Sequence, residues 1–125
     1  KLGDLSPTRD FNYVEDTCRG FLAVLEHNRT IGETINIGSN QEISIKDILN
    51  LIKELMDSNV NFVEEKQRLR PEKSEVFRLW CDNTKIEKLT GFKPQITVRE
   101  GLQKTIDWII QPDHLRKYKA EIYNV

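Results

Sequence analysis

Basic side chains gather in one short stretch of this 125-residue chain. Three arginines and a lysine fall within eleven residues: Arg68, Arg70, Lys73 and Arg78. A guanidinium group presents a planar fork of donors that matches phosphate and carboxylate oxygens, so such a cluster can hold an anion. Pro71 biases Arg70 towards an extended backbone, which would hold that arginine in a shaped connection. The stretch predicts either a phosphate-binding loop or an ordinary charged loop facing water.

Another arginine, Arg9, lies outside this cluster, between a turn and an aromatic, extended segment. Its guanidinium could also hold a phosphate through two hydrogen bonds. If Arg9 and Arg70 met one pyrophosphate, charge-assisted bonds of roughly 1.5–3 kcal/mol each would raise affinity on the order of a hundred- to ten-thousand-fold. The alternative for Arg9 is an internal ion pair with Asp10 or Glu15.

Residues that break bonds are not arranged in any familiar pattern. The sequence contains no glycine-rich phosphate loop, no Gly-x-Ser-x-Gly, no paired-histidine metal motif and no Tyr-x-x-x-Lys. His27 and His114 have no partner nearby, so we interpret both as surface or capping histidines. Four carboxylates stand at predicted helix starts, where capping explains them: Asp16, Asp47, Asp82 and Glu100. We therefore assign no catalytic residue and no metal ligand.

The composition indicates one globular domain with a charged exterior, since 38% of the residues are hydrophobic and 31% are charged. Lys plus Arg (19) nearly balances Asp plus Glu (20), which argues against a nucleic-acid-binding face or an anionic-membrane surface. Cys18 and Cys81 form no metal or disulfide pattern, and we expect both to be buried as small hydrophobes. Without a long apolar run or a signal-peptide pattern, we expect a cytoplasmic protein.

Hydrophobic periodicity predicts an α+β fold of three to four amphipathic helices with two or three short strands. Helices are expected over about 14–28, 45–56, 83–90 and 98–110, with a further one in the tail; strands are expected over 34–38, 59–63 and 76–80. Such short strands hardly make a sheet of their own, which suggests a piece that leans on something larger. We divide the chain into a binding domain, 1–110, and a charged tail, 111–125, that could form one more helix.

Local signals fix two helix starts most clearly. Ser44 can cap the second helix, with Asp47 placed to return the bond, and Thr97 with Glu100 forms a capping box. On the first helix, the apolar residues predicted to face the core are Val14, Cys18, Phe21, Leu22 and Leu25. Gly20 in the same helix indicates close packing against a neighbour.

Several segments, in order, resemble the extended short-chain dehydrogenase/reductases that act on nucleotide sugars. Residues 9–16 are similar to that family's R-D-[FYW]-x-[YH]-V-x-D signature, and residues 32–38 to its G-x-x-x-N-[IL]-G strand. Arg70-Pro71, with Asp82-x-x-Lys85 and Leu89-x-Gly91-Phe92-x-Pro94 after it, resembles a further family region. The match covers about residues 1 to 110.

The resemblance implies the carboxy-terminal, substrate-binding part of an NAD-dependent 4,6-dehydratase or epimerase with a Rossmann parent fold. It implies that Arg9 and Arg70 contact the diphosphate of a UDP- or GDP-sugar. For the ribose hydroxyls it suggests Glu75, with Glu72 as a competitor. Asn40 is either a substrate contact or a turn residue. NAD(P) and the catalytic residues belong to the parent enzyme, and no cofactor is expected in this chain.

The partners implied are the amino-terminal Rossmann half, the nucleotide sugar and a second copy in a homodimer. The start at Lys1 looks like a cut through a longer protein. The apolar faces that such a half would cover should then be exposed, and the chain alone should be catalytically incomplete. The alternative is a stand-alone, non-catalytic module that binds a nucleotide or a protein.

Overall fold

The computed structural model of the protein describes residues 2–65 and 76–118. Helices and short strands alternate along them, which confirms the predicted α+β class. The elements are β1 (Thr8–Arg9), α1 (Val14–Glu26), the 3-10 helix η1 (Asn28–Thr30), β2 (Ile43–Ser44), α2 (Ile45–Leu55), β3 (Arg78–Leu79), α3 (Thr84–Thr90), α4 (Val98–Ile109) and α5 (Pro112–Leu115). Each of these helices is too short or too polar to cross a lipid bilayer.

The sheet has the strand order β2-β1-β3, so β1 is its central strand. β1 runs antiparallel to β2, with Arg9 opposite Ile43, and parallel to β3, with Arg9 opposite Leu79. The strand β3 confirms the extended stretch predicted over 76–80, in a shorter form. β2 was not predicted, because its two residues also carry the start signal of the following helix.

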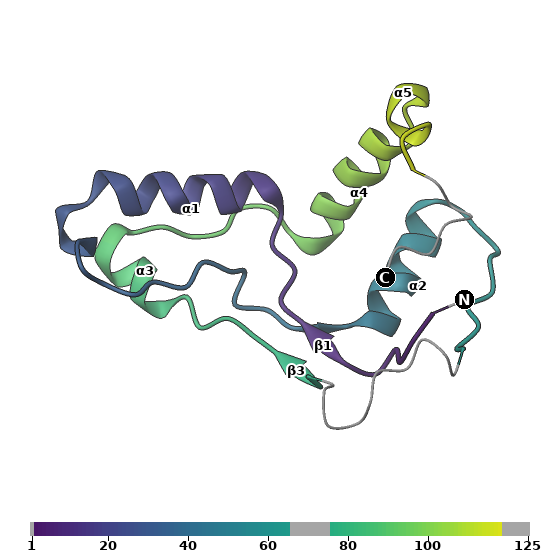
Figure 1. Cartoon of the computed structure of the whole chain (residues 1–125), viewed down its shortest axis with the longest axis horizontal. Coiled ribbons are helices and arrows are strands. Elements are labelled where there is room, and N and C mark those ends of the chain that lie inside the picture. Colours follow the sequence, from purple (N-terminus) through teal and green to yellow (C-terminus); the bar gives the residue numbers. More distant parts are fainter. Residues whose placement is uncertain (1, 66–75, 119–125) are drawn as a thin grey trace.

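The elements spread along one long axis, with the sheet near the middle (Figure 1). At one end α1 packs beside α3, and at the other α2 packs beside α4. The buried apolar side chains among the described residues are few: Ile48 of α2, Ile86 of α3 and Phe92 after it, of which Ile86 is fully buried. Hydrogen bonds between distant segments add to the contacts of this small core.

Helix starts follow the local sequence signals. The Ser44 side chain accepts a hydrogen bond from the backbone N–H of Asp47 at 3.0 Å, which begins α2 as predicted. At α4 the Thr97 hydroxyl accepts from the Glu100 N–H at 3.2 Å, and the Glu100 carboxylate accepts from the Thr97 N–H at 2.9 Å. This reciprocal pair is the predicted capping box.

The short helix α3 also begins and ends as its sequence indicates. The Asp82 carboxylate accepts from the backbone N–H of Thr84 at 2.9 Å. Gly91 ends the helix with φ 75°, a left-handed conformation that glycine adopts at little cost. Ile86 faces inward and is fully buried, as its predicted place on the inner side requires.

Two predicted strands are absent from the described residues. Segment 34–38 is not a strand, since its backbone forms no backbone–backbone hydrogen bond with any residue in 2–65 or 76–118. Its Ile37 instead packs on α1, where a Cβ placed on Gly20 would lie 2.6 Å from Ile37 Cγ2. That contact confirms the close packing predicted at Gly20. Segment 59–63 is also not a strand; next to it, Leu2 forms a single parallel bridge with Glu64.

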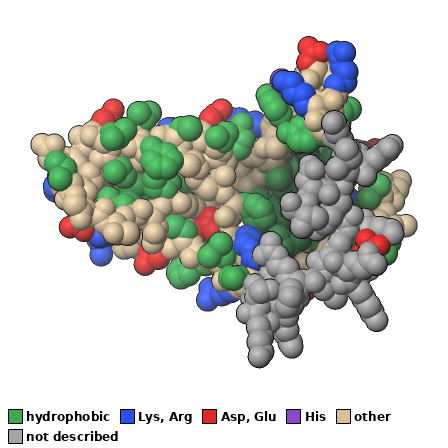
Figure 2. Space-filling model, in the orientation of Figure 1, with side chains coloured by type: hydrophobic (Ala, Val, Ile, Leu, Met, Phe, Trp, Pro, Cys, Tyr) green, Lys and Arg blue, Asp and Glu red, His purple; other side chains and the backbone are tan. Residues whose placement is uncertain are grey.

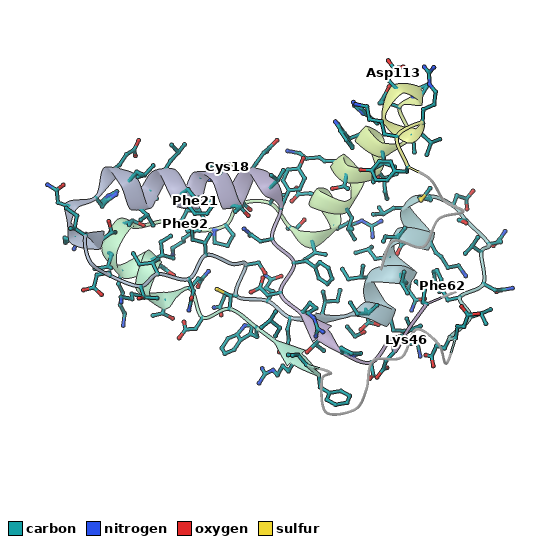
Figure 3. All side chains as sticks on the ribbon, in the orientation of Figure 1. Cys18, Phe21, Lys46, Phe62, Phe92 and Asp113 are labelled. Carbon is teal, nitrogen blue, oxygen red and sulfur yellow. The ribbon has the colours of Figure 1, made fainter. Side chains whose placement is uncertain are left out.

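The apolar stripe of α1 faces solvent, contrary to the prediction that it faces the core. Val14 is 62% exposed, Phe21 60% and Leu25 81%, and Cys18 on the same face is exposed too. The buried positions of α1 are Asp16 and Gly20. Figure 3 labels Cys18 and Phe21 on this helix, and Figure 2 shows hydrophobic side chains at the surface of this end of the molecule. The side of α1 that carries Asp16 and Gly20 therefore faces the interior, and its apolar side faces solvent.

Candidate functional site

Arg9 occupies the centre of the sheet, where neighbours on both sides fix its backbone. The Asp10 N–H after it donates to the Leu79 carbonyl at 3.0 Å, and the Thr8 N–H before it donates to the Phe77 carbonyl at 2.8 Å. The Arg9 side chain is half-buried, and its Nη1 donates to the Thr8 carbonyl at 2.7 Å. The backbone of Arg9 is therefore held by β2 on one side and by β3 on the other.

The Asp10 side chain joins three segments of the chain. One oxygen, Oδ1, accepts from the Ser39 N–H at 2.9 Å and from the Ser39 hydroxyl at 2.6 Å. The other, Oδ2, accepts from the Asn40 N–H at 3.0 Å and from the Cys81 N–H at 3.3 Å. The turn after segment 34–38 and the residue after β3 thus both donate hydrogen bonds to the carboxylate of Asp10, which follows Arg9 in the chain.

Asn40 lies in this turn with φ 58°, in the left-handed region that asparagine tolerates better than most residues. Gly38 precedes it at a very close approach, because a Cβ there would lie 2.4 Å from the Cys81 Cβ. Asn40 is therefore a turn residue, and its contact with substrate stays a prediction. Its bond to Asp10 holds this turn against the strand that carries Arg9.

Arg70 and Glu75, and the competing Glu72, fall outside the described residues. Of the basic cluster, Arg78 is described: its Nε pairs with the Glu42 carboxylate, and its guanidinium lies 5.4 Å from the centre of the Trp80 ring. Arg78 therefore contacts Glu42 and Trp80 of its own chain.

An open hollow of about 650 Å³ lies beside Asp10, between α1, segment 35–38 and the residues after β3. Its walls are mostly apolar and include Phe21, Ile37 and Trp80. Cys81 also lines it, half-buried, and desolvation followed by the nearby charges of Asp10 and Asp82 raises the pKa of its thiol above 9.0. The prediction that both cysteines are buried was wrong, because Cys81 is half-buried and Cys18 is exposed.

Asp16 has a role that the sequence did not indicate. We expected it to cap the first helix, but it is fully buried and accepts from the backbone N–H groups of Gln95 at 3.1 Å and Ile96 at 2.9 Å. Its carboxylate also pairs with Arg19 one turn along α1. Asp16 therefore fastens α1 to the connection that leads into α4.

The histidines behave as predicted. His27 Nδ1 lies 2.7 Å from the Ala23 carbonyl at the end of α1, and His114 Nδ1 lies 2.8 Å from the Trp108 carbonyl at the end of α4. The His114 ring also stacks on Trp108 with centroids 3.8 Å apart. Within residues 2–65 and 76–118, no three His, Cys, Asp or Glu side chains are grouped so as to hold a metal ion.

The described residues offer no cradle for a dinucleotide. A site of that type needs a parallel strand followed by a glycine-rich turn and a helix. Here the strand β1 passes to α1 through residues 10–13, which contain no glycine, and its parallel contact with β3 is two residues long. We assign no step of bond breaking to the residues around Arg9 and Asp10.

Known proteins are similar to this chain in fold and in sequence. Residues 1–105 match the family model of GDP-mannose 4,6 dehydratase. The chain is 33% identical over 109 residues to the UDP-glucuronate 4-epimerase of Thermodesulfobacterium geofontis, covering 86% of this chain and 32% of that protein.

Solved structures give the same result. The epimerase Mth375 of Methanothermobacter thermautotrophicus superimposes with a TM-score of 0.82 and 34% identity, over 93% of this chain and 34% of that one. The Bacillus cereus UDP-glucuronic acid 4-epimerase, solved with UDP-glucuronic acid and NAD, gives a TM-score of 0.74 and 34% identity over 88% of this chain and 34% of its own.

The chain spans about a third of the length of the relatives that it matches. The match agrees with the resemblance read from the sequence and runs through the sheet, α1 and most of α4. The chain therefore belongs to the GDP-mannose 4,6-dehydratase family, within the NAD-dependent epimerases and dehydratases of the extended short-chain dehydrogenase/reductases.

Proposed function

We propose that this chain is the substrate-binding part of an NAD-dependent nucleotide-sugar 4,6-dehydratase or epimerase, and that it holds the nucleotide diphosphate of a UDP- or GDP-sugar. The observation that carries the proposal is the family match over residues 1–105 combined with the place of Arg9 at the centre of the sheet. Because β2 and β3 hold the Arg9 backbone from both sides, only its side chain has to be ordered when it binds a phosphate, which favours affinity.

Arg70 is the second arm of the proposed diphosphate clamp. It follows Arg9 in the family order and precedes Pro71, which restricts its backbone. We propose Glu75, or Glu72 in its place, for the ribose hydroxyls, and Asn40 as a secondary contact through the turn that Asp10 holds. A bidentate arginine on each side of a pyrophosphate would place the sugar in one orientation.

The cofactor and the reacting groups are proposed to lie in an amino-terminal Rossmann half. When bound there, NAD would supply transient oxidation of the sugar; this chain would orient the nucleotide end of the same substrate. Support comes from the two observations above: the chain spans about a third of its relatives, and its described residues offer no dinucleotide cradle. We place the enzyme in the cytoplasm.

The exposed stripe on α1 supports a covering partner. Phe21, Leu22 and Leu25 are each more than half exposed, and Ile31 just beyond the helix is 79% exposed. Apolar side chains at helical spacing on one face are typical of a surface that another polypeptide buries. We propose that the Rossmann half covers this stripe, and that the chain expressed alone pairs with a second copy instead. The assembled enzyme is proposed to be a homodimer.

The experiment that tests the proposal begins with the coding sequence upstream of Lys1. We expect an open reading frame that encodes a strand, a glycine-rich turn and a helix. The full-length enzyme is then incubated with NAD and UDP-glucose, UDP-glucuronate, GDP-mannose or dTDP-glucose, and the products are separated by chromatography. We expect an epimer or a 4-keto-6-deoxy sugar from at least one substrate. A start codon directly before Lys1, or no product from any of them, would favour the stand-alone module.

A further inference from the structure

The Asp10 side chain connects β1 to two remote segments of the chain. Its carboxylate accepts four hydrogen bonds, from the Ser39 N–H and hydroxyl, the Asn40 N–H and the Cys81 N–H, at 2.6 to 3.3 Å. The donors lie 29, 30 and 71 positions away in the sequence. One carboxylate therefore joins two remote segments to β1, in addition to the backbone bonds that pair β1 with β3.

We propose that Asp10 is a positioning residue for nucleotide-sugar binding, which fixes the turn of Asn40 and the exit of β3 against the strand that carries Arg9. The proposal rests on the proposed function, because Arg9 and Asn40 are its candidate substrate contacts. Successive backbone N–H groups next to a left-handed residue form a concave anion site. Here the anion that the N–H groups of Ser39 and Asn40 bind is the Asp10 carboxylate, which holds the turn against the sheet.

The close packing at this point explains why the carboxylate determines the geometry. A Cβ added to Gly38 would lie 2.4 Å from the Cys81 Cβ and 3.1 Å from Asp10 Oδ2. The turn and the end of β3 are therefore already in contact, with no room for a longer bridging side chain. Asparagine at position 10 has nearly the same size, but its amide NH₂ would face N–H donors instead of accepting from them.

Asp16 provides a matched control. It is also a carboxylate that accepts two backbone N–H groups of a distant segment, at 2.9 and 3.1 Å. It lies at the junction of α1 with the connection into α4, and its donors are not those of Asp10. Asp16→Asn should therefore cost stability as Asp10→Asn does, without breaking the bonds that hold the turn.

The test uses the full-length enzyme and measures KM and kcat for its best nucleotide sugar, Kd for UDP and GDP, and Tm. Both variants are assayed well below their melting temperatures. We expect Asp10→Asn to raise Kd and KM about tenfold with kcat within about twofold, and Asp16→Asn to lower Tm while Kd stays within about twofold of wild type. Ser39→Ala, which removes one of the four donors and leaves the fold intact, should raise Kd about threefold.

The outcomes separate this inference from the proposed function. Tight UDP or GDP binding by the wild type, with Asp10→Asn and Ser39→Ala equal to it, would overturn the role of Asp10 alone. An equal rise in Kd for Asp10→Asn and Asp16→Asn would reduce Asp10 to a structural residue and would also overturn it. A wild-type enzyme that binds no nucleotide would end the proposed function, and this inference with it.

Discussion

The buried carboxylate of Asp16 accepts a hydrogen bond from the backbone N–H of Ile96 at 2.9 Å, across 80 positions of sequence. Asp10 makes a similar connection to Ser39 and Cys81 at the other side of α1. The described part of the chain has few fully buried apolar side chains, so these two carboxylates fix the relative positions of elements that a larger core would otherwise hold.

Asp16→Asn should lower the free energy of unfolding by on the order of 3 kcal/mol. The amide carries no charge to pair with half-buried Arg19, and its NH₂ replaces one of the two acceptor oxygens that Asp16 presents to Gln95 and Arg19. Urea unfolding followed by circular dichroism measures the change. The control is Glu15→Gln, since Glu15 is 57% exposed and pairs with Lys104 at the surface. Its effect should stay under about 1 kcal/mol, and equal effects of the two variants would refute the structural role of Asp16.

Stability should fall as the pH is lowered below about 4.5. The Thr97 side chain, followed by its backbone N–H, holds the pKa of Glu100 below the ordinary value of 4.5. The Thr84 side chain and then its N–H do the same for the pKa of Asp82, below 3.8. Because the folded pKa is the lower one in each case, the stabilisation is complete above the unfolded pKa and is lost as pH falls through the folded pKa.

Melting temperatures between pH 6 and pH 3 test this assignment. Thr97→Val removes the hydroxyl that lowers the Glu100 pKa, so the variant should be less stable at pH 6 and should lose less stability on acidification than the wild type. If the melting temperatures of the variant and the wild type differ by the same amount at every pH in this range, the capping box does not contribute to the acid dependence.

Cys18 should report whether the apolar stripe of α1 becomes covered. At low concentration of the 125-residue chain, we expect iodoacetamide at pH 8 to label exposed Cys18 faster than Cys81, whose thiol is half-buried and has a raised pKa. Raising the protein concentration should slow the labelling of Cys18 alone, if second copies pair through the stripe. Mass spectrometry of the peptides measures both rates.

The double variant Phe21→Ser and Leu25→Ser serves as the control for this labelling. It removes two of the most exposed side chains of the stripe, so Cys18 should label at one rate at all concentrations. Light scattering on the same samples should give a dimer for the wild type and a monomer for the variant. A wild-type monomer with concentration-independent labelling would contradict pairing through α1.

Local sequence signals predicted the helix starts, because a cap needs only residues three positions apart. The Ser44 and Thr97 caps and the end of α3 at Gly91 are in place as expected. The contact of Ile37 with Gly20 was partly visible as a glycine inside a helix. Such features depend on the chain within one or two turns.

Long-range features escaped prediction for a physical reason. Segment 34–38 has the alternation of a strand, yet a strand exists only with a neighbour, and none of the described residues supplies one. The stripe of α1 has the spacing of a core face, but which side turns inward was decided by Asp16 and its donors 80 positions away. Arg9 was recognised as a candidate from its neighbours, whereas the bonds of Asp10 to Ser39 and Cys81 had no sequence signal.

The most direct test of the account is a calorimetric titration of the full-length enzyme with UDP and with GDP. Arg9→Ala and Arg70→Ala are compared with the wild type and with Arg116→Ala, an exposed arginine whose partner Asp113 lies in the same short helix region. We predict that the wild type binds one of the two nucleotides, that Arg9→Ala and Arg70→Ala each weaken binding at least about tenfold, and that Arg116→Ala has no effect. Wild-type affinity in both Arg9→Ala and Arg70→Ala would contradict the diphosphate clamp.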